Sequence, residues 1–130
     1  MAKGEFTFRG KSLEELKAMS IAQFGELCNS RQRRNLKNGF DKQLLKKLDK
    51  ARGNPKAKPV RTHRRDIVVI PAMVGIRMAI HRGNSFDMVD ITEKMLGHYT
   101  GELVLTRKKL QHGKAGIGAT KSSSAVTARG

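Results

Sequence analysis

Apolar residues recur at helical spacing through the first part of the chain. Ser12 is followed three positions later by Glu15, which is the spacing of a capping box at the start of a helix. Ser20 and Gln23 repeat that spacing. We therefore expect two short helices, each with one apolar side, formed by Leu13 and Leu16 in the first and by Ile21, Phe24 and Leu27 in the second.

Two more helices follow in the pattern. Residues 31–39 are strongly basic and predict a helix that ends at Gly39 in a left-handed conformation. Asp41 has the position of an N-cap for a helix that stops at Gly53, before a linker at residues 54–60 in which two prolines forbid helix. This last helix has an apolar side of Leu44, Leu45, Leu48 and Ala51, and a basic side of Lys42, Lys46, Lys47 and Lys50. For any one of these lysines we favour a solvated surface.

The signals of β-structure come after the linker. Residues 67–70 are a β-branched run that Pro71 ends or places at the edge of a sheet. Residues 76–81 alternate between apolar and other side chains, which is the period of a strand with one buried face. The turn chemistry of residues 82–84 then predicts a hairpin over residues 76–90.

These patterns divide the chain into three sections and indicate an α+β protein. Residues 1–40 form a helical N-terminal extension, and residues 41–106 form the α+β core that we expect to bind RNA. Residues 107–130 form a flexible basic tail, which is too poor in large apolar residues to fold alone. No acidic residue follows Glu102, so the tail is cationic throughout.

The charge balance indicates the kind of partner. Lys and Arg number 27 against 11 Asp and Glu, which gives a net charge of +16. Like charges repel in the compact state, so a polyanionic partner such as nucleic acid is the natural compensation. A protein of the membrane surface is the main rival class. It needs large apolar residues opposite its charges, and the chain has no Trp to anchor such a helix.

Cysteine usage and the start of the chain bear on the compartment. Cys28 is the single cysteine, so we exclude an intramolecular disulfide and expect a small core residue in a reducing compartment. The first ten residues contain no signal-peptide pattern, and no window approaches the ~18 apolar residues of a membrane span. We expect a cytoplasmic protein without a membrane partner.

The densest group of cations lies where the linker enters the first predicted strand. It comprises Lys56, Lys58, Arg61, Arg64 and Arg65, with Thr62 and His63 beside them. Arginine offers a planar fork that matches phosphate oxygens, and only Asp66 is near enough in sequence to neutralise the group. We interpret it as an RNA-phosphate site.

Other chemistry finds little support in the sequence. The four histidines are scattered without cysteine partners, so we expect no metal site. His98 with Glu102 and His63 with Asp66 are the acid–base pairs close in sequence, but neither comes with a nucleophile, so we expect no enzyme and no cofactor. Five Phe, one Tyr and no Trp make base stacking secondary to phosphate contacts.

Several longer motifs follow one another in order along the chain. They are NLKNGF at 35–40, KPVRTHRRD at 58–66, IPAMVG at 70–75, the hairpin turn at Gly83 and the block around MLGHYTGEL at 95–103. With these motifs, the stretch from residue 58 to residue 106 closely resembles the universal small-subunit ribosomal protein S-nineteen family. The helical N-terminal extension and a tail of the form HG-x-x-GIGAT-x-SS resemble the archaeal or eukaryotic type, with archaeal favoured. The sequence departs from the family's usual residues at Arg82, Thr100, Leu103 and Ala115.

The resemblance implies a structural constituent of the small ribosomal subunit head. It implies a small antiparallel sheet of about three strands packed against helix, with an extended tail that reaches toward the decoding region and the tRNAs. It further implies small-subunit rRNA and the head protein S-thirteen as partners, a cytoplasmic, ribosome-bound location and no homo-oligomer. The alternative that the charge leaves open is a free-standing basic RNA- or DNA-binding chaperone.

The candidate site residues fall into two groups. For rRNA binding, the resemblance and the basic runs together indicate Arg31, Arg33, Arg34, Lys37, Lys56, Lys58, Arg61, Thr62, His63, Arg64, Arg65, His98, Arg107, Lys108 and Lys109. For a tail near the tRNAs, the resemblance indicates His112, Lys114, Gly116, Gly118, Thr120, Lys121, Ser122 and Ser123.

Overall fold

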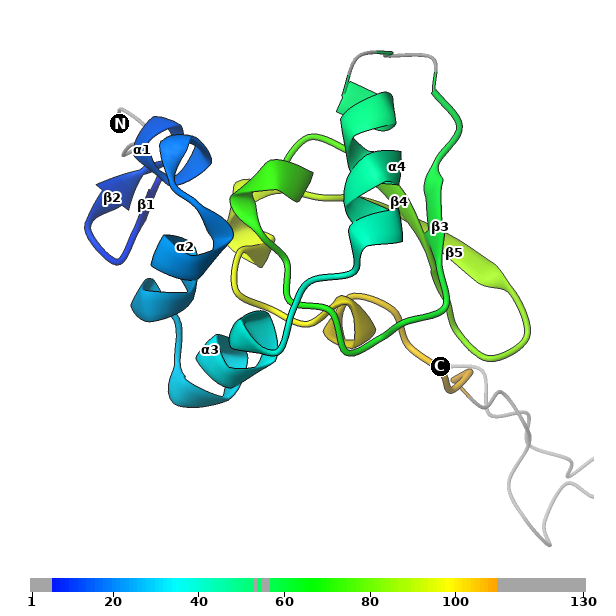
Figure 1. Ribbon diagram of the computed structural model, residues 1–130. Helices are drawn as coiled ribbons and strands as arrows, with labels where there is room; N and C mark the ends of the chain where they lie inside the picture. Colours follow the sequence, from blue (N-terminus) through cyan, green and yellow to red (C-terminus); the bar gives the residue numbers. More distant parts are fainter. Residues whose placement is uncertain (1–5, 53, 55–56, 110–130) are drawn as a thin grey trace, which may run out of the picture.

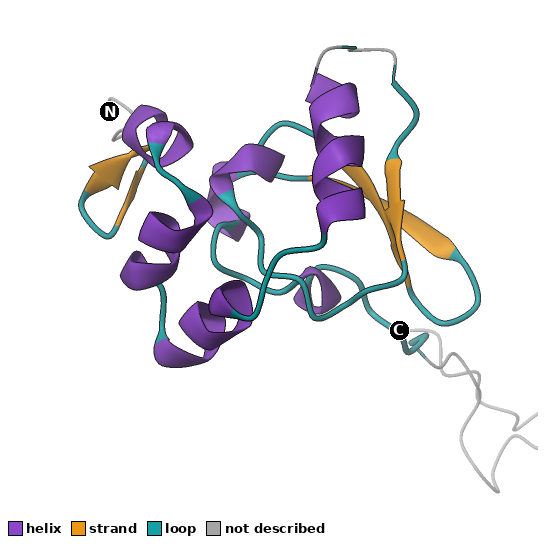
Figure 2. Ribbon diagram, in the orientation of Figure 1, coloured by secondary structure: helices purple, strands orange, loops and turns teal. Residues whose placement is uncertain are grey.

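The computed structural model describes residues 6–52, 54 and 57–109 (Figures 1 and 2). A short hairpin and three helices come first, and they are β1 (Thr7–Phe8), β2 (Lys11–Ser12), α1 (Leu13–Ala18), α2 (Ile21–Leu27) and α3 (Ser30–Lys37). The rest of the fold is α4 (Lys42–Arg52), β3 (Val60–Thr62), β4 (Arg77–His81) and β5 (Phe86–Asp90), with the 3-10 turns η1 (Pro71–Met73), η2 (Glu93–Met95) and η3 (Thr100–Glu102).

The predicted helix starts are confirmed by side-chain capping. Ser12 accepts a hydrogen bond from the amide of Glu15, and the Glu15 carboxylate accepts one from the amide of Ser12. Ser20 and Gln23 make the same reciprocal pair at α2. Asp41 caps α4 by accepting from the amides of Gln43 and Leu44. These caps satisfy backbone N–H groups that a helix leaves unpaired, so each start is fixed locally.

The helix ends agree with the sequence where they are described. Gly39 has φ of +103° after α3, as its left-handed role requires. Gly53, the predicted stop of α4, lies outside the described residues. The hairpin β1–β2 was not predicted, and its turn at Arg9 and Gly10 uses positive φ at both positions.

The three-stranded sheet has the order β3-β4-β5. The predicted hairpin over residues 76–90 is confirmed, with β4 antiparallel to β5. β3 runs parallel to β4, so the sheet is mixed rather than wholly antiparallel. The α+β class is confirmed, and Figure 1 shows α4 lying over the sheet next to β3.

The prediction of a strand at residues 67–70 is wrong. This run is buried and forms a single bridge, between Val68 and Tyr99, rather than a strand of the sheet. Its backbone pairs with the segment before η3: the amide of Val69 donates to the carbonyl of His98 at 2.8 Å, and the amide of Thr100 donates to the carbonyl of Ile67 at 2.9 Å. The apolar run is therefore core lining, and it fixes where η3 lies.

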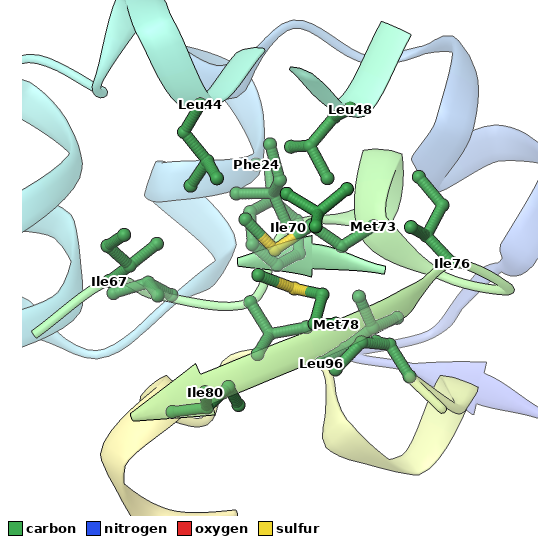
Figure 3. Close-up of a cluster of buried hydrophobic side chains, with 14 of the residues drawn as sticks. Phe24, Leu44, Leu48, Ile67, Ile70, Met73, Ile76, Met78, Ile80 and Leu96 are labelled. Carbon is green, nitrogen blue, oxygen red and sulfur yellow. The ribbon is translucent and has the colours of Figure 1, made fainter. Parts of the chain in front are cut away.

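One hydrophobic core joins the N-terminal helices to the sheet (Figure 3). Phe24 of α2 belongs to the same buried cluster as Leu48 of α4, Met73 of η1 and Ile80 of β4. Cys28 is buried in this cluster as expected, and burial raises the pKa of its thiol above the usual 9.0. The helical extension thus packs on the core and positions α3 against it.

Candidate nucleic-acid interface

The first basic surface lies on α3, opposite η3. Arg31, Arg34 and Lys37 are exposed on this helix, whereas Leu36 points into the core. An open cleft of about 450 Å³ lies between the helix and Tyr99, and Asn35 and Asn38 line it beside the arginines. The Arg31 guanidinium carbon is 5.4 Å from the centroid of the Tyr99 ring, which is cation–π range. We call Arg31, Arg34, Lys37 and Tyr99 the α3 surface.

Close packing holds the η3 turn at this cleft. Thr100 is completely buried, and its hydroxyl donates to the carbonyl of Arg64 at 3.0 Å. The amide of Gly101 donates to the carbonyl of Arg65 at 2.9 Å. A Cβ at position 101 would lie 2.9 Å from that same oxygen, so only glycine permits the approach. Thr100, one of the departures from the family's usual residues, therefore has a packing role.

Three of the residues predicted to contact RNA make hydrogen bonds within the protein. Arg65 is half-buried and donates to three backbone carbonyls, those of His81 (2.9 Å), Gly101 (2.7 Å) and Val104 (2.7 Å). Arg33 similarly donates to carbonyls at the end of α2 and just beyond it, those of residues 25, 26 and 28. Thr62 is buried, and its hydroxyl oxygen accepts from the amide of Arg64. Their binding of RNA stays a prediction, and their observed role is to brace the backbone.

Arg64 is exposed but partly neutralised. Its guanidinium makes a bidentate pair with Asp66, with a shortest distance of 2.8 Å, and lies 3.9 Å from Asp41. The hydrogen bond from Arg64 lowers the pKa of the Asp66 carboxyl below its usual 3.8. Both side chains remain at least half exposed, so water and salt screen the pair and the guanidinium is still accessible to a phosphate.

The second basic surface lies beside β3. Lys58, Arg61 and His63 are exposed here, and they were predicted from sequence. Lys47 and Lys50 of α4 join Lys58 and Arg61 around a groove of about 560 Å³, which we call the β3 groove. From the sequence we favoured a solvated surface for each of these two lysines. The signal that could have identified them is that the lysines of this helix recur at helical spacing and so share one side.

A third basic surface lies at the turn of the β4–β5 hairpin. Arg82 and Asn84 of the turn line a cleft of about 320 Å³ together with Arg107 and Lys108 from the end of the described chain. Lys109 is exposed next to them. Arg82 pairs with Asp87 at 3.3 Å, which orients its guanidinium at this cleft. We call it the hairpin-end cleft. The sequence analysis included Arg82 in the predicted turn and as a departure from the family, but not among the RNA-binding residues.

The remaining predicted contacts lie outside the described residues. They are Lys56 in the linker and the tail positions His112, Lys114, Gly116, Gly118, Thr120, Lys121, Ser122 and Ser123. The flexible tail predicted over residues 107–130 is described only as far as residue 109. These assignments stay predictions.

Of the two acid–base pairs noted in the sequence, the structure brings together His98 with Glu102 but not His63 with Asp66. The His98 Nδ1 atom lies 2.6 Å from a carboxylate oxygen of Glu102, one helical turn away on the exposed side of η3. Asp66 pairs with Arg64 rather than with His63. Within residues 6–52, 54 and 57–109, no three His, Cys, Asp or Glu side chains gather in a way that would hold a metal ion. In the same part of the chain, no helix is long and apolar enough to cross a bilayer.

The arrangement is typical of a small protein that binds a polyanion through its surface: open basic clefts, a modest core and cations on several elements. Comparison with known proteins agrees. A sequence model of the family described as Ribosomal protein S19 matches residues 31–112. The chain is 44% identical over 128 residues to the small ribosomal subunit protein uS19 of Halobacterium salinarum, covering 95% of this chain and 91% of that protein.

The chain therefore belongs to the ribosomal protein S19 family, as its motifs indicated. The match to a Halobacterium protein over nearly the whole chain supports the archaeal type. Membership makes it a structural, non-enzymatic constituent of the small ribosomal subunit.

Proposed function

We propose that this protein binds small-subunit rRNA along an edge formed by the α3 surface, the η3 turn and the hairpin-end cleft. The observation that carries the proposal is the pair of open clefts that the segment 99–108 shares, one with α3 and one with the β4–β5 turn. One continuous stretch of backbone thus joins the two clefts. Its neighbours, α3 and the turn between β4 and β5, both lie on the lower side of the molecule in Figure 1.

The electrostatics support phosphate binding on this edge. The exposed Arg34 and Lys37 have no carboxylate within 4 Å among the described residues, so both cations are available to a phosphate. Asp66 and Glu102 also line the cleft at α3, and they pair with Arg64 and His98 instead. Binding a phosphate releases a condensed counterion, and log affinity falls with log salt by about 0.9 per contact on a duplex. The protein thus acts by holding RNA in a fixed geometry, with no chemical step.

The family resemblance supports finer proposals. We place the protein in the head of the subunit beside protein S-thirteen, ribosome-bound in the cytoplasm, with the tail of residues 107–130 reaching toward the decoding region and tRNA. A free-standing RNA chaperone shares the charge, but it has no need for a closely packed glycine and a buried threonine that fix one turn beside one cleft.

A charge-matched pair of variants tests the proposal. The test variant combines Arg31→Gln, Arg34→Gln and Lys37→Gln, and the control combines Lys17→Gln, Lys46→Gln and Lys94→Gln, all of them exposed in the fold. Binding of the full chain to naked small-subunit rRNA is measured by fluorescence anisotropy over a salt series. We expect the test variant to lose about tenfold or more in affinity at ~0.1 M salt, and its salt slope to fall by about 2 to 3.

The control variant should lose affinity by about threefold or less, since it changes the same net charge away from the edge. If both variants weaken binding equally, charge alone governs binding and the proposed edge is wrong. Salt-independent binding of the unaltered protein would contradict phosphate recognition itself.

A further inference from the structure

The register of the sheet sorts its side chains onto two faces. Residues directly opposite one another across strands share a face, so Val60, Met78 and Val89 lie together, and Arg61, Ala79 and Met88 lie together on the other side. The first set faces the core, with Val60 and Met78 buried. The second set therefore belongs to the outer face of the sheet.

The outer face carries a cluster of rings. His81 of β4 is opposite Phe86 of β5, and their ring centroids are 4.9 Å apart in an edge-to-face arrangement. His63, just after β3, lies 4.6 Å from His81 and 4.9 Å from Phe86. Three rings in mutual contact form one surface, although the chain as a whole is poor in aromatic residues.

An arginine completes this surface. The guanidinium carbon of Arg61 is 5.4 Å from the centroid of the Phe86 ring, and Arg61 is exposed. The His81 ring is held by the amide of Gly83, which donates to its Nδ1 at 3.2 Å. We call Arg61, His63, His81 and Phe86 the ring platform. Its parts come from all three strands, so the sheet holds them in fixed relation.

The neighbours of the platform are apolar and basic. Ala79 lies on the outer face but is completely buried, because the longer side chains of Arg61 and Met88 flank it. The predicted alternation of buried and exposed residues along β4 therefore fails at this position. Met88 itself is 60% exposed. Arg61 and Met88 also line the β3 groove, whose other walls include Lys47, Lys50 and Lys58. None of the described residues that line this groove is acidic.

Charge pairing separates the platform from the rest of the outer face. Arg77 and Asp90, at the other end of the β4–β5 pair, form an ion pair in which Arg77 Nε lies 2.6 Å from Asp90 Oδ1. Arg61 has no carboxylate within 4 Å among the described residues. The unneutralised arginine is thus the one that lies over a ring.

We propose that the ring platform binds an unpaired base of RNA, with the flanking phosphates held by the lysines of the β3 groove. Every base has a π-face that stacks on aromatic rings and on the guanidinium plane of arginine, and this is how proteins hold unpaired nucleotides. The basic, acid-free groove is complementary to the phosphates on either side. A single exposed methionine is too small an apolar patch for a stable protein interface, which favours RNA as the occupant. The inference rests on the proposed function, since it assumes that RNA is the ligand.

The test uses the full chain and three RNA probes. The first is a single strand of about 12 nucleotides with 2-aminopurine at its centre, whose fluorescence is quenched by stacking. The second is the same strand with an abasic nucleotide in place of 2-aminopurine. The third is a duplex of about 16 base pairs, which reports phosphate binding alone. The variants are Arg61→Lys, which keeps the charge and removes the plane, His63→Ala and Phe86→Leu, with Arg77→Lys as the control on the same face.

The platform predicts that the unaltered protein quenches 2-aminopurine and binds that strand about tenfold more tightly than the abasic one. Arg61→Lys and His63→Ala should each remove most of that difference while changing duplex affinity by about twofold or less. Both residues are exposed, so these variants fold even if Phe86→Leu disturbs the hairpin. Arg77→Lys should behave like the unaltered protein.

Equal affinity for the base-bearing and abasic strands, with duplex binding intact, would overturn the platform and leave the proposed function standing. Loss of quenching in Arg77→Lys as well would also overturn it, because the effect would then not belong to the platform. If the unaltered protein binds none of the three probes and no small-subunit rRNA, the proposed function itself fails.

Discussion

At the scale of single residues, two glycines show how the same amino acid serves different ends. Gly101 lets the backbone of η3 approach the carbonyl of Arg65, where a Cβ would meet oxygen at 2.9 Å. Gly25 lies inside α2, and a Cβ there would meet Leu36 at 3.5 Å, which is ordinary van der Waals contact. Sequence alone does not distinguish these cases, because each glycine is followed directly by a glutamate and no local motif separates the two.

The two positions therefore give a matched prediction. Gly101→Ala forces backbone to shift and should lower the free energy of unfolding by about 1 to 3 kcal/mol. Gly25→Ala should leave stability unchanged or raise it by up to about 1 kcal/mol, because alanine favours the helix. Urea unfolding of both variants checks the pair. Equal effects would show that the contact between η3 and Arg65 is not tight in solution.

At the scale of elements, local chemistry was predictable and non-local pairing was not. The helix starts follow from serines and an aspartate three residues or fewer from the amides they cap, so the sequence contains the whole interaction. The parallel pairing of β3 with β4 depends on where the chain returns after residue 62, which no local pattern encodes. The run at 67–70 looked like a strand because burial on all sides and β-structure favour the same β-branched residues.

The clamp made by Arg65 joins elements that are far apart in sequence. Its guanidinium ties the end of β4 to η3 and to Val104, just before the chain enters the hairpin-end cleft. The position of Arg65 in a basic run indicated an RNA contact. In the fold, its planar guanidinium donates hydrogen bonds to three backbone carbonyls instead.

Replacing this arginine tests the clamp. Arg65→Lys keeps the charge but cannot reach three carbonyls in a plane, so we expect the free energy of unfolding to fall by about 2 kcal/mol or more. Arg64→Lys is the control, since Arg64 is exposed and pairs only at the surface, and it should cost about 1 kcal/mol or less. Guanidinium unfolding measures both. Similar losses in the two variants would refute a special role for Arg65.

At the scale of the whole molecule, charge and family motifs indicated the partner class, and the fold decided which cations are available. Sequence analysis named Arg33, Thr62 and Arg65 alongside Arg31, Arg34 and Arg61, because all lie in basic runs. The fold turns the first three inward and leaves the others exposed. Composition could not predict the ring platform. Its members lie on β4, on β5 and in or just after β3, and only the register of the sheet brings them together.

An integral protein of the small ribosomal subunit that is held there by rRNA should stay bound when loosely held proteins are removed. The most direct measurement is a sucrose gradient of lysate from cells that make the tagged protein, after a salt wash of ~0.5 M that strips loosely held cations. We expect the unaltered protein to be retained in the small-subunit peak, at one copy per subunit. Release to the top of the gradient would contradict it and would favour a free-standing nucleic-acid binder.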